Sequence, residues 1–238
     1  MKNYKANFNY FDVIDTPNKA YWLGFLFADG YIARRERITN ANSKRIEYNL
    51  KISVKDSDDE ILAKLIKDLE SNYPIHYYNV KSSFGDTREA RLFITNKYMV
   101  EKLYNEYGIT PNRTSIQKIL NILPENLYRY FILGLFDGDG SFTFYYIHEN
   151  HRKILLRFGG SEEILRFIES ILIKEQLVAP IQRQLERRHK EGDGTWRCLT
   201  FAGMNNCVQI LNWLYQDSPI YLERKYQKYL NVLKELNK

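Results

Sequence analysis

Hydrophobic and polar residues follow two different periods along the chain. Between residues 45 and 55, Ile46, Tyr48, Leu50, Ile52 and Val54 alternate with polar side chains. A period of two is typical of a strand with one apolar and one polar face. Between residues 56 and 70, apolar residues recur at helical spacing after a run of acidic residues, which predicts an amphipathic helix because acids are favourable at a helix N-terminus.

The same criteria predict two series of elements in the same order. The first has a helix over 16–29, with Thr16 as N-cap and Pro17 in the first turn. It continues with strands 31–37 and 45–55, helix 56–70, strands 75–81 and 87–95, and helix 97–107. The second has helix 125–137, strands 141–148 and 153–159, helix 161–176, strands 181–188 and 195–201, and helices 205–215 and 222–236.

A sequence repeat supports this division into two similar halves. WLGFLFADGY at 22–31 returns 110 residues later as ILGLFDGDGS at 132–141, and DEILAK at 59–64 returns as EEILRF at 162–167. We therefore predict an α+β fold of two pseudo-symmetric αββαββα repeats, each with a four-stranded antiparallel sheet. Residues 1–107 form the first repeat, 108–124 a linker and 125–238 the second repeat.

Both repeated helices end in a carboxylate, at Asp29 and Asp139, directly before Gly30 and Gly140. The negative end of the helix dipole disfavours an acid there by about 0.3–1 kcal/mol. Local rules are most often broken at functional sites. The occurrence of the same exception in both copies therefore marks the two aspartates as candidate functional residues.

Each repeated helix also contains an interior glycine, Gly24 in the first and Gly134 in the second. An interior glycine costs about 1 kcal/mol relative to alanine, and close approach of two backbones is the usual compensation. Parallel packing through these glycines would bring Asp29 beside Asp139. Two adjacent carboxylates repel unless a cation lies between them, and oxygen ligands favour Mg²⁺. Such a site suits in-line displacement at phosphorus.

The two motifs, their spacing and the order of elements resemble those of the LAGLIDADG homing endonucleases of the monomeric, two-repeat type. The resemblance covers nearly the whole chain. It implies packing through the two motif helices and Mg²⁺-dependent cleavage of both DNA strands across the minor groove, leaving short 3′ overhangs. Mn²⁺ is expected to substitute, and Ca²⁺ to permit binding without cleavage.

The resemblance also assigns roles to residues. The eighth motif position, the family's acidic metal ligand, is Asp29 in one copy and Asp139 in the other, with Gly30 and Gly140 beside them in the metal site. The sixth position is Phe27 in the first copy and Asp137 in the second. The sixth position is often acidic in the family, and Phe27 departs from that pattern. We therefore interpret Asp137 as a solvated or capping residue rather than as a metal ligand.

The family places a basic residue near each active site, late in each repeat. The candidates by position are Arg113 and Lys225, which we predict to be catalytic, with Lys118, Arg224 and Lys228 as runners-up.

The polar faces of the strands are the predicted contact with DNA. Two sheets of such strands side by side would cover about 20 base pairs. Their side chains are those that contact bases in the major groove or phosphates. The predicted DNA-binding residues are Arg35, Arg37, Arg45, Asn49, Lys51, Ser53, Lys55, Lys81, Arg88 and Arg91 in the first repeat, and Thr143, Tyr145, Lys153, Arg157, Gln182, Gln184, Arg187, Arg188 and Arg197 in the second.

Composition narrows the class of protein. The chain has 238 residues, 44% of them hydrophobic, which excludes a disordered chain. Its apolar runs are far shorter than the roughly 20 residues of a membrane span, and no basic region with an apolar core opens it. We expect an intracellular monomer with no membrane partner, most readily bacterial or phage-encoded, with an organellar source left open. Cys198 and Cys207 form neither a disulfide framework nor a zinc site. The net charge of +6 is compatible with nucleic acid as a partner.

Other functions remain open on the sequence alone. A LAGLIDADG protein can act on RNA as an intron maturase, or bind DNA without cutting as a regulator whose site has decayed. Retention of both aspartates argues against decay, and too few residues follow the second repeat for an added helix-turn-helix. An embedded intein is disfavoured by the chain's ends, and a purely structural α+β module would need no acid at either helix terminus.

Overall fold

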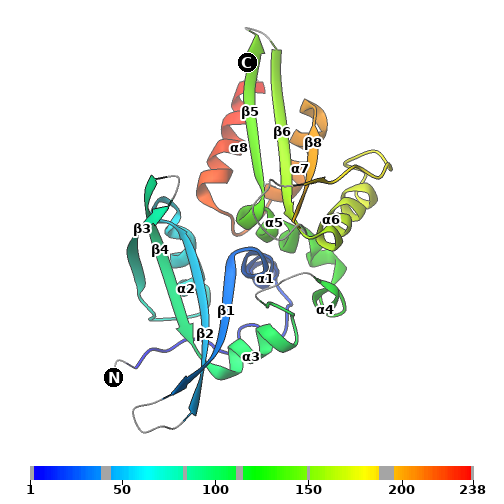
Figure 1. Cartoon of the computed structure of the whole chain (residues 1–238). Coiled ribbons are helices and arrows are strands. Elements are labelled where there is room, and N and C mark those ends of the chain that lie inside the picture. The colour runs from blue at the N-terminus through cyan, green and yellow to red at the C-terminus, as the bar shows by residue number, and fades with distance from the viewer. Residues whose placement is uncertain are drawn as a thin grey trace.

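The computed structural model describes residues 3–38, 44–82, 85–110, 115–148, 151–187 and 196–236. Figure 1 shows two sheets separated by a central pair of helices, with further helices packed against each sheet.

The first half begins with α1 (Pro17–Asp29), which Thr16 caps by accepting a hydrogen bond from the backbone N–H of Lys19. The elements that follow are β1 (Gly30–Ile38), β2 (Lys44–Lys55), the 3₁₀ turn η1 (Asp56–Asp58), α2 (Glu60–Asp68), β3 (Ile75–Ser82), β4 (Gly85–Thr95) and α3 (Lys97–Asn105). All strand pairs are antiparallel, and the order in the sheet is β1-β2-β4-β3.

The second half follows the same plan with its own additions. Its elements are η2 (Glu125–Leu127), α5 (Tyr128–Asp139), β5 (Ser141–His148), β6 (His151–Gly160), α6 (Glu162–Lys174), β7 (Glu186–Arg187), β8 (Arg197–Ala202), α7 (Met204–Tyr215) and α8 (Glu223–Leu236). The strand order β5-β6-β8-β7 repeats that of the first sheet. Within the described residues β7 covers only Glu186 and Arg187, so the described part of the second sheet is essentially three-stranded.

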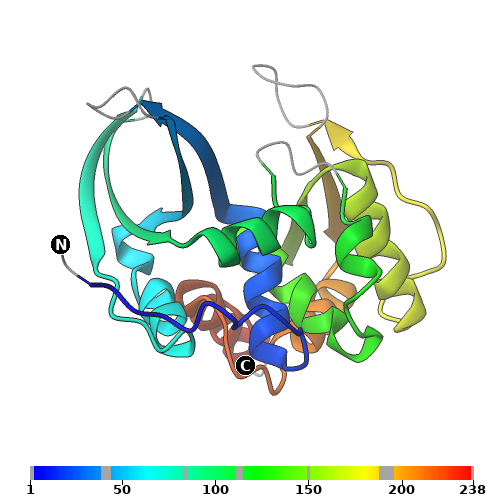
Figure 2. The same cartoon turned by 90° about the horizontal axis from the view of Figure 1, so that it is seen from below.

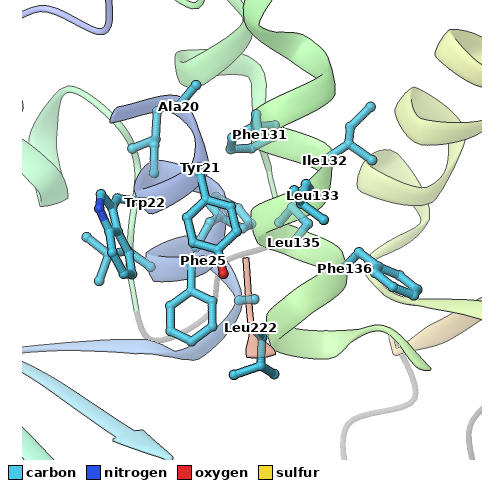
Figure 3. Close-up of a cluster of buried hydrophobic side chains, with 14 of the residues drawn as sticks. Ala20, Tyr21, Trp22, Phe25, Phe131, Ile132, Leu133, Leu135, Phe136 and Leu222 are labelled. Atoms are coloured by element: carbon cyan, nitrogen blue, oxygen red, sulfur yellow. The ribbon is translucent and has the colours of Figure 1, made fainter. Parts of the chain in front are cut away.

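Helices α1 and α5 lie side by side between the sheets and form the most extensive helix–helix contact of the described chain; both views show the pair at the centre (Figures 1 and 2). Every side chain from Ala20 to Ala28 and from Phe131 to Asp137 is buried. Aromatic and branched residues such as Tyr21, Phe25, Phe131 and Leu135 fill the space around the pair (Figure 3). These two helices therefore form the centre of the hydrophobic core rather than a surface layer.

The predicted linker is only partly a linker. Residues 117–120 form the short helix α4 (Gln117–Leu120), and Ile116, Ile119 and Leu123 are buried. Burial of these apolar side chains anchors the segment to the core, and no helix was predicted there.

The predicted strand 181–188 is largely wrong. Residues 181–185 belong to no strand, and only Glu186 and Arg187 pair with β8. The backbone N–H of Arg183 donates to the Glu169 carboxylate on α6, at 2.9 Å, instead of to a neighbouring strand. A side chain has thus replaced the sheet partner.

Among the described helices, none combines the length and apolar character needed to cross a membrane.

Candidate functional site

The contact between α1 and α5 is built around the two interior glycines. A Cβ atom added to Gly24 would lie 2.1 Å from the carbonyl oxygen of Phe131, and one added to Gly134 would lie 2.1 Å from that of Tyr21. Real Cβ contacts are essentially never shorter than 3.0 Å. The two backbones therefore touch at both positions in a way that a side chain would prevent, which is the close approach expected from the sequence.

This crossing brings the C-terminal ends of the helices together. A Cβ atom added to Gly138, the residue before Asp139, would lie 3.4 Å from the Asp29 carboxylate oxygen Oδ2 and 2.3 Å from the Cβ of Ala28. The Asp29 carboxylate thus lies against the last turn of α5. Asp29 and Asp139 are both half-buried, so both carboxylates lie at the edge of the core.

Asp137 is neither solvated nor a helix cap, contrary to the interpretation from the sequence. It is 2% exposed and accepts hydrogen bonds from the Tyr21 and Tyr215 hydroxyls, each at 3.0 Å, and from the backbone N–H of Leu222 at 2.7 Å. Burial raises the pKa of its carboxyl, while Lys225 and these donors oppose the rise. Its bonds join α1, α5 and the start of α8, so it organises the junction from within.

Lys225 lies under the end of α5. Its ammonium group donates to the carbonyl oxygens of Phe136 at 2.5 Å, Asp137 at 2.8 Å and Gly140 at 2.7 Å, and the residue is 5% exposed. Burial lowers the pKa of Lys225 to about 8, although the nearby charges of Asp137, Asp29 and Asp139 favour its protonated form. A cation is stabilising at the negative end of a helix. It therefore offsets the unfavourable placement of an aspartate there.

The other basic candidates have different places. Arg113 lies outside the described residues. Arg224 forms a bidentate ion pair with Asp58, in which Nε donates to Oδ1 at 3.0 Å and Nη2 donates to Oδ2 at 3.0 Å. Lys118 donates to the carbonyl of Asn105, and Lys228 to that of Phe142. Of the basic candidates with described side chains, Lys225 is the one bonded to a motif helix.

We call the side of each sheet that faces away from the helices its outer face. In the first sheet, Ala90, Leu92 and Ile94 of β4 are fully buried, so the alternate residues of the paired strands define the outer face. Asn49, Lys51, Ser53, Lys55 and Arg91 lie on it, and Arg35, Arg37 and Arg45 occupy strand positions of the same alternation. The register of the second sheet places Thr143, Tyr145, Lys153 and Arg157 on its outer face.

Three predicted DNA contacts lie on the other side. Arg88 and Lys81 share the alternation of Ala90 and Leu92, and the Arg88 guanidinium lies 4.9 Å from the centre of the Tyr77 ring. Arg197 shares the alternation of Leu199 and Phe201. Their assignment to the outer face is wrong because each side chain is on the same side of its strand as the core residues. Each lies toward one end of its strand, past the last buried hydrophobic residue of the sheet. Arg188 lies outside the described residues, and no side chain is described at Arg187.

The register gives each helix end a basic neighbour on the adjacent strand. Tyr31, two residues after Asp29, pairs with Lys51, and Ser141, two residues after Asp139, pairs with Arg157. Lys51 and Arg157 thus occupy equivalent positions in the two halves. The equivalence becomes visible only once the strand pairing is known.

A buried ion network on α6 was not predicted from the sequence. Glu169, 3% exposed, accepts from Arg166 at 2.8 Å and from the backbone of Arg183 at 2.9 Å. Arg183 turns inward, with its guanidinium 4.9 Å from the centre of the Phe201 ring, while Gln182 and Gln184 are exposed. The only sequence signal was an acid at an apolar position of an amphipathic helix.

The donor set at the junction fits a hard cation. Mg²⁺ in proteins is commonly held by one or two carboxylates, with waters and substrate phosphates completing its shell. Asp29 and Asp139 supply two carboxylates, and Gly30 and Gly140 adjoin them. In the part of the chain that the structure describes, no three His, Cys, Asp or Glu side chains form a ready metal site.

Comparison of the fold with solved structures gives a consistent result. The chain superposes on the LAGLIDADG homing endonuclease I-GzeII in complex with its DNA target with a TM-score of 0.62 and 12% identity, covering 93% of this chain and 89% of the other. For the meganuclease I-SmaMI bound to uncleavable DNA, the TM-score is 0.61 at 16% identity, covering 92% and 89%. For the LAGLIDADG meganuclease I-CpaMI bound to uncleaved DNA, it is 0.60 at 12% identity, covering 94% of each chain.

No family model and no curated protein matches the sequence. At these identities the likeness establishes the fold, and the resemblance inferred from the motifs is confirmed at that level: the chain has the fold of the LAGLIDADG homing endonucleases.

Proposed function

We propose that this chain is a LAGLIDADG homing endonuclease, a site-specific enzyme that recognises a long DNA target with its two sheets and hydrolyses one phosphodiester in each strand. The observation that carries the proposal is the meeting of the helix ends, with the Asp29 carboxylate against the last turn of the helix that ends in Asp139. A purely structural role would not require an aspartate at the C-terminal end of each of the two central helices. The three fold neighbours described above, all bound to DNA, support the substrate class.

In this proposal Asp29 and Asp139 hold Mg²⁺ at the junction. A bound ion would supply the activation of water and the stabilisation of the leaving oxygen that an in-line displacement at phosphorus requires. The chain positions the two carboxylates. The glycine contacts hold the ends of α1 and α5 together, and the hydrogen bonds of Asp137 link both motif helices to the start of α8. The Lys225 ammonium group compensates the partial negative charge of the carbonyl oxygens at the C-terminus of α5.

The outer faces provide the surface for duplex DNA. Lys51, Lys55, Arg91, Lys153 and Arg157 lie on them, and cations that neutralise phosphates supply much of the affinity for DNA. Because both motif helices belong to one chain, the proposed enzyme is a monomer that spans both half-sites, about 20 base pairs together.

The test is cleavage of a plasmid library of randomised sites in Mg²⁺ by the wild-type chain and the Asp29→Asn and Asp139→Asn variants. We expect the wild type to cut a defined subset of sites, and each variant to lose cleavage but keep binding. Asp15→Asn, which changes an exposed carboxylate before the N-terminus of α1, is the matched control and should cut normally. Binding without cleavage in Ca²⁺ is a further expected result.

The nuclease assignment fails if the wild type cuts no site, or if the motif variants cut as fast as it does. Tight binding of structured RNA by a chain that cuts no DNA would favour the maturase function instead.

A further inference from the structure

Three aromatic side chains lie together on the outer face of the first sheet. His76 and Tyr78 come from β3 and Phe93 from β4, with ring centres separated by 6.1 Å for His76–Phe93, 6.4 Å for Tyr78–Phe93 and 6.5 Å for His76–Tyr78. The strand register confirms their side: His76 pairs with Arg91 and Phe93 with Lys51, both on the outer face. We call these three residues the aromatic patch.

The patch does not belong to the hydrophobic core. The core side of β4 is supplied by Ala90, Leu92 and Ile94, each fully buried, whereas Tyr78 is 41% exposed and His76 is also exposed. Clustered aromatic side chains on an exposed strand face cost solvation without adding to the core, and such patches commonly mark a contact surface.

Two cations, Lys51 and Arg91, and one acid, Glu89, flank the patch on the outer face, so the net charge around it is positive. The Arg91 guanidinium lies 4.6 Å from the centre of the Tyr78 ring and is held there by an ion pair between its Nε and Glu89, at 2.9 Å. Lys51 lies directly across from Phe93. The ligand that suits this surface is locally apolar and globally anionic. Duplex DNA offers that combination in its major groove, where the 5-methyl group of thymine projects among base edges flanked by phosphates.

At the described positions of the second sheet that correspond to Phe93 and His76, no aromatic residue is present. Arg157, the counterpart of Lys51, pairs with Thr200 where the first sheet has Phe93. Cys198, the counterpart of Arg91, pairs with Glu186 where the first sheet has His76. The two halves therefore present different chemistry to the two half-sites.

We propose that the aromatic patch contacts the methyl group of thymine in the major groove, so that the half-site bound by the first sheet contains a thymine recognised through its methyl group. The proposal rests on the proposed DNA binding and adds the base class that this surface prefers. Replacement of that thymine by uracil removes one methyl group and leaves every hydrogen-bonding group in place. The loss of one buried methyl corresponds to about a fourfold weaker affinity.

The experiment starts from a target selected from randomised duplexes by the wild-type chain in the absence of Mg²⁺. Each thymine of both strands is then replaced singly by uracil, and the dissociation constant is measured by fluorescence anisotropy. We expect about a fourfold loss at one or two neighbouring thymines within one half-site. Phe93→Ala and His76→Ala should bind the thymine and uracil forms equally at those positions.

Tyr98→Ala is the matched control, because Tyr98 is 49% exposed but lies on α3 rather than on the sheet; it should discriminate as the wild type does. Thermal unfolding of each variant separates a change of binding from a loss of folding. The proposal is overturned if no uracil substitution weakens wild-type binding, if both patch variants still discriminate, or if the selected target has no required thymine. A chain that selects no DNA at all refutes the proposed function itself.

Discussion

Replacement of Gly134 by alanine tests whether contact between the two helix backbones holds the site together. The new Cβ would lie 2.1 Å from the carbonyl oxygen of Tyr21 and 2.7 Å from the amide nitrogen of Phe25. Both are backbone atoms, so neither can rotate away. Since Cβ contacts below 3.0 Å are essentially never seen, the helices must separate by about 1 Å, a core strain that typically costs 1–3 kcal/mol.

A second effect acts in the opposite direction, so the sign of the change in the free energy of unfolding is informative. Alanine stabilises an isolated helix by about 1 kcal/mol relative to glycine, so a loosely packed pair would become more stable. We expect instead a net loss of about 1–2 kcal/mol, because a clash with two backbone atoms puts the strain at about 2–3 kcal/mol, which exceeds the gain in propensity. The same displacement would move Asp139 relative to Asp29, and a shift of about 1 Å in catalytic geometry can reduce a rate by about 10²-fold.

Urea denaturation and the single-turnover cleavage rate measure the two effects. Gly160→Ala is the matched control, since its Cβ would meet the Ile164 side chain at an ordinary 3.5 Å. If Gly134→Ala proves as stable as the wild type, or more so, the close backbone contact is not present in solution and the reasoning fails. Gly24→Ala, with its Cβ 2.1 Å from the Phe131 carbonyl oxygen, should behave in the same way.

Three further predictions follow from other contacts. Lys225→Met removes the ammonium donor shared by three carbonyl oxygens at the α5 terminus, of which that of Phe136 keeps the backbone N–H of Gly140; it should lower the free energy of unfolding by about 2 kcal/mol, measured in urea, and an unchanged stability would contradict the buried position. Arg224→Ala should destabilise the chain more than Asp58→Ala, because it leaves the Asp58 carboxylate, whose side chain is 6% exposed, buried without its partner, whereas Asp58→Ala leaves the Arg224 side chain, 56% exposed, in contact with water; in a double-mutant cycle, a coupling energy near zero would refute the ion pair. Burial raises the pKa of the Cys207 thiol to about 11, so at pH 8 it is protonated and a thiol reagent should modify only the half-exposed Cys198 in the native chain and both cysteines in urea; native modification at both would contradict the burial.

The duplicated pattern of the sequence was enough to predict much of the fold and the central pair of helices. Period-two alternation identified β2, and the paired Gly and Asp positions of the two motifs identified α1 and α5 as the helices that meet. These signals are local or repeated, and each has a direct physical cause: alternation follows the pleat of a strand, and an interior glycine requires a compensating contact.

Other features depended on tertiary contacts that leave no local trace. Residues 181–185 carry glutamines at alternate positions, as an exposed strand face would, yet a buried carboxylate on α6 takes the place of a strand partner. Asp137 is indistinguishable in sequence from a solvated aspartate, and only the arrival of Tyr21, Tyr215 and Leu222 from three distant segments satisfies its buried charge.

The same distinction separates the predicted DNA contacts. A basic residue can be recognised in any strand, but whether it faces away from the helices depends on the register with its neighbours. The register placed Lys51 and Arg91 on the outer face, and Arg88 and Lys81 on the other. The sequence alone therefore determined which residues are candidates for metal binding and DNA contact, because side-chain type and spacing are local properties. The tertiary structure decided which of them act together, since one residue of register moves a side chain to the opposite face of a sheet.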